Sequence, residues 1–215
     1  CGRISTRFQP VAAFLAGAVA WWAGVVCVGF LASFVQVLAF RQIAAVAAAP
    51  GFVSAVSSVL LLVALSWLLK TMLSWRMLRS ETLAVEFALQ QSLEAGRSRL
   101  SMLVSRDTSE LGESEVRESA IESLAENLND SVVAPVFWFL VFGLPGAAIY
   151  RFANTADAMW GYRGVRHGVQ WEWAGKWAAW ADDALSWVPA RITAMLLLLA
   201  ALDGSSLRRL PAEAR

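Results

Sequence analysis

Two long apolar runs dominate the first third of the chain. Residues 11–40 carry no charged side chain over the whole run. At about 1.5 Å per residue, a helix of this length exceeds the roughly 30 Å hydrocarbon core of a bilayer. A second apolar run covers residues 52–69, and Pro50-Gly51 marks the turn between the two. Both runs are therefore predicted to be membrane-spanning helices.

The pattern becomes amphipathic over residues 76–131. Apolar residues recur there at helical spacing, at Leu78, Val85, Leu89 and Leu93. Gly96 is predicted to break this helix. Residues 106–130 then hold eight of the chain's 17 acidic residues. We predict a polar helical insert, 76–131, that lies outside the hydrocarbon.

A third apolar segment, residues 132–150, is interrupted by Gly143-Leu144-Pro145-Gly146. The part before this break would form roughly 16 Å of helix, about half the thickness of the hydrocarbon. Two interpretations compete, a kinked full span and a re-entrant hairpin. The hairpin is slightly favoured because it keeps the flanking polar segments on one side. A last span is predicted at about residues 187–202.

Composition agrees with these spans. The 215 residues are 58% hydrophobic and only 16% charged, whereas about a quarter of the residues in a soluble domain are charged. The predicted fold is all-α: one membrane domain over residues 1–215, a polytopic integral membrane helical protein with a broken or re-entrant segment and a cytoplasmic helical polar region. A net charge of +1 without a basic cluster argues against a nucleic-acid partner.

Arginines indicate the orientation in the membrane. If the first two runs both cross, Arg3 and Arg7 share a side with the arginine-bearing segment 70–131, and the loop between the runs has only Arg41. The positive-inside rule then places the polar insert in the cytoplasm. We expect a multi-pass protein of the cell (inner) membrane, in contact with membrane lipid.

The end of the polar insert carries a stripe of carboxylates and amides. In a helix, one narrow sector would hold Glu115, Glu118, Glu122, Glu126 and Asn129, with Asp130 at its edge. Acids at i, i+4 and i+8 repel one another, and a divalent cation or arginines from elsewhere would relieve the repulsion. Carboxylate oxygens suit Mg²⁺. The alternative is an acidic face that is simply solvated.

A second polar group follows the Gly-Pro break. Arg151, Asn154 and Asp157 recur every three residues, so they roughly share one face of a helix. Polar residues that point one way beside a membrane segment predict a ligand site. The competing interpretation is a helix that faces water at the membrane surface.

Two further sets of charges are weaker indications. Arg106-Asp107 precedes the carboxylate stripe, where Asp107 could instead cap a local turn. Asp183 lies shortly before Arg191 at the start of the last span, where the arginine could simply extend to the membrane surface. The chain has no GxxxxGK[ST] phosphate-binding loop, so a nucleotide would have to be held in another way.

Four ordered motifs resemble those of one family: RDTSEL, AIESLAENLNDSVVAPVFW, GLPGAAIYRFANTADAMWGYR and DDALSWVPARITAMLLLLAA. The resemblance is to the adenosylcobinamide-phosphate synthase family of cobalamin biosynthesis, the CobD/CbiB type, and covers about residues 60–202. It implies a multi-pass membrane enzyme that joins cobyric acid, a corrinoid, to aminopropanol or its phosphate through an amide bond, using ATP.

The resemblance also implies roles for individual residues. The expected catalytic residues are Asp107, Glu122, Glu126 and Asp130, of which the last three would hold Mg²⁺ or orient the amine. The expected binding residues for substrates and phosphates are Arg106, Arg151, Asn154, Asp157, Tyr162, Arg163, Asp183 and Arg191. The resemblance is compatible with a homo-oligomer.

The chain departs from the family pattern in three ways. Ser131 stands where members usually have Gly, and Ser186 where they have Asn. Members are also longer, so we expect this chain to be truncated at both ends. One rival interpretation is a non-catalytic membrane sensor of the same superfamily, similar to AmpE-type proteins. Another is a transporter, against which the absence of an internal repeat argues.

Overall fold

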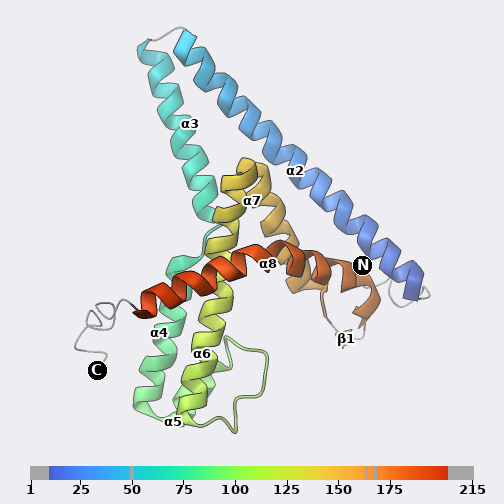
Figure 1. Cartoon of the computed structure of the whole chain (residues 1–215), viewed down its shortest axis with the longest axis vertical. Helices are drawn as coiled ribbons and strands as arrows, with labels where there is room; N and C mark the ends of the chain where they lie inside the picture. Colours follow the sequence, from blue (N-terminus) through green and yellow to red (C-terminus); the bar gives the residue numbers. More distant parts are fainter. Residues whose placement is uncertain (1–9, 49–50, 163, 167–168, 203–215) are drawn as a thin grey trace. The chain divides into compact units, whose positions relative to one another are not determined.

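The computed structural model describes residues 10–48, 51–162, 164–166 and 169–202 (Figure 1). Its helices are α2 (Pro10–Ala48), α3 (Phe52–Thr71), α4 (Trp75–Gln91), α5 (Leu93–Leu100), α6 (Glu113–Leu128), the π-helix η1 (Asn129–Val133), α7 (Ala134–Trp160) and α8 (Glu172–Leu202). The strands β1 (Val165–Arg166) and β2 (Val169–Gln170) form a short antiparallel pair. The prediction of an all-α chain is confirmed.

Four helical stretches are long and apolar enough to cross a membrane: Pro10–Val46, Phe52–Gln91, Glu113–Trp160 and Glu172–Leu202. They contain the four predicted apolar segments, so the prediction of a polytopic membrane protein is confirmed. Large apolar side chains on α2 and α3 are exposed, such as Phe30 at 68% and Phe52 at 84%. Lipid-facing helices present such surfaces, because the bilayer core is itself apolar.

The described residues fall into two compact units. The first is formed by the described parts of Cys1–Leu73 and Ala134–Trp187, and the second by those of Ser74–Val133 and Val188–Arg215. The single membrane domain stays a prediction.

In the first unit, α7 is broken at Gly143, as predicted from the Gly-Leu-Pro-Gly sequence. Gly143 has φ 68° and ψ −153°, a backbone conformation that is nearly exclusive to glycine. The chain reverses there, and a methyl group added to Gly146 would collide with the backbone carbonyl of Trp138. In a straight helix these two residues would lie about 12 Å apart along the axis. Figure 1 shows α7 as two short arms, as the hairpin interpretation requires.

A side chain from α2 stabilises this break. The Leu144 N–H has lost its helical partner and donates a hydrogen bond of 2.7 Å to Gln36 Oε1. A backbone N–H without a partner is costly at membrane depth. Gln36 therefore satisfies the helix end that Gly143 creates. The apolar run 11–40 gave no reason to expect this role.

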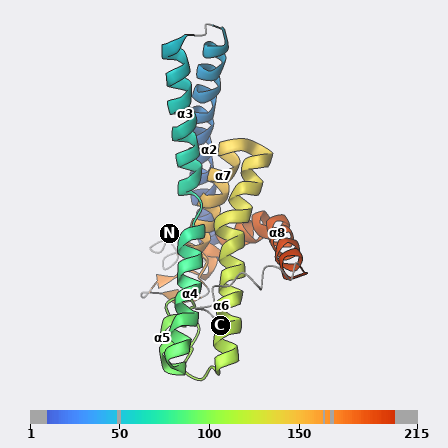
Figure 2. The ribbon, with the colours of Figure 1, turned by 90° about the vertical axis from the view of Figure 1, so that its left-hand side faces the viewer.

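In the second unit, α4, α5 and α6 pack around one apolar core (Figure 2). The core consists of Val85, Leu89, Leu100, Val116 and Ala120. The prediction that Gly96 breaks the first helix is wrong: Gly96 lies inside α5, and the break is at Ser92. The Ser92 hydroxyl accepts a hydrogen bond from the Ala95 N–H and caps α5, which a serine does well.

Candidate functional site

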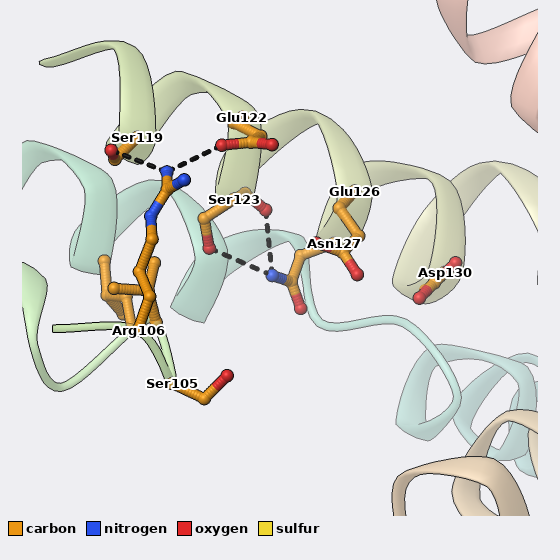
Figure 3. A pocket seen from close by; sticks show the side chains of 10 residues that line it. Ser105, Arg106, Ser119, Glu122, Ser123, Glu126, Asn127 and Asp130 are labelled. Carbon is orange, nitrogen blue, oxygen red and sulfur yellow. Dashed lines mark hydrogen bonds and ion pairs between the residues drawn. The ribbon is translucent and has the colours of Figure 1, made fainter. Parts of the chain in front are cut away.

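Arg106 connects the loop before α6 to the face of α6. Its Nη2 donates to Ser119 Oγ at 2.6 Å and to Glu122 Oε2 at 2.7 Å (Figure 3). The side chains of Arg106 and Glu122 are 50% and 68% exposed. Such an exposed ion pair adds little to stability, typically below about 1 kcal/mol. Arg106 is therefore placed well for contact with a ligand, and its contribution to the fold is small.

The loop that carries Arg106 is held by two hydrogen bonds to α5. Thr108 Oγ1 donates to the Arg97 carbonyl at 3.1 Å, and Arg97 Nε donates to the Leu111 carbonyl at 2.7 Å. Thr108 is itself buried. These bonds fix both ends of the segment between residues 108 and 111, next to Arg106. The guanidinium therefore projects from an anchored loop.

A polar cavity of about 400 Å³ opens beside this pair. Its lining residues are Leu103, Val104, Ser105, Arg106, Ser119, Glu122, Ser123, Glu126, Asn127 and Asp130. Glu122, Glu126 and Asp130 follow one another along one wall (Figure 3). The lining thus combines three carboxylates with one guanidinium, so its charge favours a cationic group of a ligand. The volume is at the lower end of the range for small-molecule sites.

Glu126 lies between the other two carboxylates. Partial loss of water raises the pKa of the Glu126 carboxyl, and the charges of Asp130 and then Glu122 raise it further. Glu126 is nevertheless exposed to solvent. A carboxylate with a raised pKa is a better proton acceptor than an ordinary one.

The helix that forms the cavity wall changes from α-helical to π-helical geometry at η1, directly after α6. Pro135 has no N–H, so the Ser131 carbonyl lacks the donor that an α-helix would supply. That carbonyl instead accepts a bond of 3.2 Å from the Ser74 N–H, at the start of α4. π-helical turns are frequent at functional sites. Here the π-helix carries Asp130 at the end of the cavity.

The predicted stripe is only partly the wall of this cavity. Glu122, Glu126 and Asp130 line it, but Glu118 does not, and Glu115 Oε2 accepts from the Gly112 N–H at the start of α6. Asn129, which the predicted stripe also included, is buried at 7% exposure and does not line the cavity.

The described residues include no group of three His, Cys, Asp or Glu side chains placed to hold a metal ion by themselves. Mg²⁺ usually takes only one or two protein carboxylates, together with water and substrate phosphates. A magnesium ion held with a phosphate substrate stays a prediction.

Two of the other predicted binding residues contact each other in the first unit. Arg151 Nη1 donates to Asn154 Oδ1 at 3.4 Å on α7, and both residues are half-buried. Asp157 lies one turn further along and is also half-buried. This face of α7 is therefore partly covered by protein. Tyr162 is exposed just after the helix, and Arg163 lies outside the described residues, as do Arg3 and Arg7.

The remaining predicted residues lie apart from the cavity lining. Asp107 Oδ1 accepts from the Ser109 N–H at 2.9 Å, and this bond lowers the pKa of the Asp107 carboxyl. It thus makes the local turn that the alternative interpretation described. Asp183 and Arg191 are exposed on α8. Their roles in binding stay predictions.

Sequence reasoning missed four polar residues of the cavity: Ser105, Ser119, Ser123 and Asn127. Ser119 and Ser123 are buried, four residues apart on α6, and Asn127 Nδ2 donates to the Ser123 carbonyl at 2.8 Å. In the sequence, Ser119, Ser123 and Asn127 form a second series at i, i+4 spacing beside the acids. This series indicates a cavity wall only once the Arg106 loop is known to lie against α6.

Comparison with known proteins gives one family. The family model described as "CobD/Cbib protein" matches residues 1–215. A probable cobalamin biosynthesis protein CobD of Pyrococcus furiosus is 49% identical over 132 residues, which is 61% of this chain and 44% of that protein. No solved structure matches significantly.

Bacterial relatives match as well. The cobalamin biosynthesis protein CobD of Chromobacterium violaceum is 51% identical over 107 residues, 50% of this chain and 33% of that protein. That of Stutzerimonas stutzeri is 42% identical over 154 residues, 69% of this chain and 50% of that protein. The matched part is thus a third to a half of the length of these relatives.

Proposed function

Because this chain belongs to the CobD/Cbib family, we propose that it acts in cobalamin biosynthesis as an adenosylcobinamide-phosphate synthase. The reaction joins a carboxylate of cobyric acid to the amine of aminopropanol or its phosphate. The observation that carries the proposal beyond family membership is the polar cavity of the second unit, with Arg106 at one end and three carboxylates along its wall.

The proposed chemistry needs an activated acid and a free amine. A carboxylate is a poor electrophile; ATP would transfer its γ-phosphoryl group to a carboxylate oxygen and leave as ADP. The amine nitrogen would then attack the carbonyl carbon, and inorganic phosphate would leave with the C–O electron pair. The amine arrives as an ammonium ion, so protons must be removed from nitrogen. Mg²⁺ would neutralise phosphate charge.

The cavity suits the amine better than the corrinoid. Its 400 Å³ would hold a molecule the size of aminopropanol phosphate, whereas a corrin ring is far larger. The carboxylates Glu126 and Asp130 would attract the ammonium group, and Arg106 would meet phosphate or the activated carboxylate. Only the reacting side chain of the corrinoid would have to enter. The arginine bias of residues 70–131 supports a cavity that faces the cytoplasm.

The test is amide formation by the purified chain in lipid nanodiscs. It would receive ATP, Mg²⁺, cobyric acid and either aminopropanol or its phosphate, in separate reactions read by mass spectrometry. Amide product in either reaction would support the proposal, and the faster reaction would identify the amine. No product in both, from protein that unfolds cooperatively, would overturn it and favour the sensor interpretation.

Replacing Arg106 with alanine should separate function from stability. We expect the unfolding free energy to change by less than about 1 kcal/mol, because the Arg106–Glu122 pair is exposed. Amide formation should fall at least about tenfold, the loss expected for one charge-assisted hydrogen bond. Arg79→Ala, at an exposed arginine of α4, is the matched control. An Arg106→Ala protein with normal kcat/KM for both substrates would contradict this role.

A further inference from the structure

Two buried polar side chains meet in the second unit. Thr193 lies in the apolar part of α8 at 3% exposure, and Asn129 begins η1 at 7% exposure. Thr193 Oγ1 donates to Asn129 Oδ1 at 3.1 Å, and the same hydroxyl lies 3.0 Å from the Pro189 carbonyl. A buried amide must be hydrogen-bonded, or its desolvation is costly. The contact therefore links the Asn129 amide to α8.

The other end of that amide meets the cavity wall. Asn129 Nδ2 donates to Asp130 Oδ1 at 2.9 Å, and Asp130 lines the cavity. If the amide were flipped, its oxygen would face the carboxylate and repel it. The carboxylate of Asp130 thus requires this orientation of Asn129, in which the amide oxygen is left to accept from the Thr193 hydroxyl. The three residues form one chain of hydrogen bonds.

The bond between Asn129 and Asp130 joins two neighbouring residues of η1. In an α-helix, the side chains of neighbouring residues point about 100° apart and do not face each other. In η1, Asn129 nevertheless reaches Asp130 while its oxygen is turned to α8. The local backbone is therefore arranged so that a buried residue contacts an acid at the cavity.

From this geometry we infer that Asn129 and Thr193 are positioning residues, which hold the Asp130 carboxylate in the cavity to receive the ammonium group of the amine substrate. The inference rests on the proposed function. Neither residue touches the cavity itself, so each acts through Asp130. A carboxylate held by a charge-assisted hydrogen bond keeps its direction and its charge, and both are needed to bind an ammonium ion.

The first test compares Thr193→Val with Thr193→Ser. Valine has nearly the shape of threonine without the hydroxyl, whereas serine keeps it. We expect Thr193→Val to raise the KM for the amine about tenfold, with the KM for cobyric acid unchanged, and Thr193→Ser to restore the original value. Thr82→Val is the control, because Thr82 makes the same bond to the carbonyl four residues earlier, at 3.0 Å from Leu78 O.

The second test measures binding without turnover. Calorimetry with aminopropanol and with its phosphate, in the absence of ATP and corrinoid, would give the dissociation constant for the intact chain and for Asn129→Leu. Leucine has nearly the shape of asparagine but can neither accept from Thr193 nor donate to Asp130, so we expect amine binding to weaken about tenfold.

The outcomes separate this inference from the function on which it rests. Suppose that product forms but valine and serine at position 193 give the same KM for the amine, or that kcat and both KM values change together with stability. Asn129 and Thr193 then serve only the fold. If no product forms but amine binding weakens as expected, the synthase proposal fails and the positioning role stands. If the intact chain binds neither amine, the positioning role fails as well.

Discussion

Replacing Glu126 with glutamine should nearly abolish amide formation and make the protein slightly more stable. In the proposed reaction Glu126 takes a proton from the ammonium group of the amine, and its raised pKa suits it to that task. Loss of a general base typically lowers the rate 10²–10⁴-fold, so we expect a fall in kcat of about 100-fold or more. Mass-spectrometric rates at saturating substrate would measure it.

The stability gain has a defined pH dependence. The folded-state pKa of Glu126 is raised above its ordinary value of 4.5, so the folded protein binds this proton more tightly than the unfolded chain does. Ionising Glu126 therefore costs stability as pH rises from about 4.5 through the raised value, and the cost is complete at neutral pH. Glutamine removes that cost. The gain should be on the order of 0.5 kcal/mol, because solvent screens this exposed group.

Chemical unfolding of both proteins at neutral pH and below pH 4.5 would measure the gain and its disappearance. Glu118→Gln is the matched control, on the same helix, exposed and outside the cavity lining. It should change neither rate nor stability appreciably. A Glu126→Gln protein that is fully active would show that Glu126 is not the base. One that is inactive and also less stable would point to a structural role.

The parts of this molecule that could be predicted from sequence are those set by local periodicity. The spans follow from uninterrupted apolar runs, because only hydropathy and length matter there. Glu122, Glu126 and Asp130 lie along one wall because residues four apart share a helix face. The Gly-Leu-Pro-Gly break follows from the backbone preferences of glycine and proline.

The parts that could not be predicted depend on contacts between distant segments. Gln36 and Leu144 are 108 residues apart, and Thr193 and Asn129 are 64 apart. No spacing rule connects such pairs; only the packed structure does. The helix break at Ser92 was missed for a different reason. Serine caps a helix well, so Ser92 was a boundary signal that the prediction at Gly96 overlooked.

Replacing Gly143 with alanine should cause the largest loss of stability in the first unit. At φ 68° and ψ −153°, any side chain strains the backbone, at about 1–3 kcal/mol. The added methyl group would also collide with the amide of Gln36, which binds the neighbouring Leu144 N–H. Strain and collision together should lower the unfolding free energy by about 2–4 kcal/mol. Titration with SDS, followed by tryptophan fluorescence, would measure it.

Gly29→Ala is the control for the loss of a glycine. Gly29 lies inside α2, where an added methyl group would meet only the flexible end of Ile149, at 3.2 Å. Its substitution should cost far less, since alanine favours the helix. A Gly143→Ala protein as stable as Gly29→Ala would show that α7 does not reverse at Gly143 and would favour the kinked full span.

A double variant can separate the two causes of the loss. Gln36→Ala removes the amide with which the methyl group collides, but it also leaves the Leu144 N–H without its acceptor, a cost of about 1–3 kcal/mol. If collision dominates, adding Gln36→Ala to Gly143→Ala should cost much less than Gln36→Ala does alone. If backbone strain dominates, the two losses should add. Only the first result requires the hairpin, because losses at two sites that do not meet would also add.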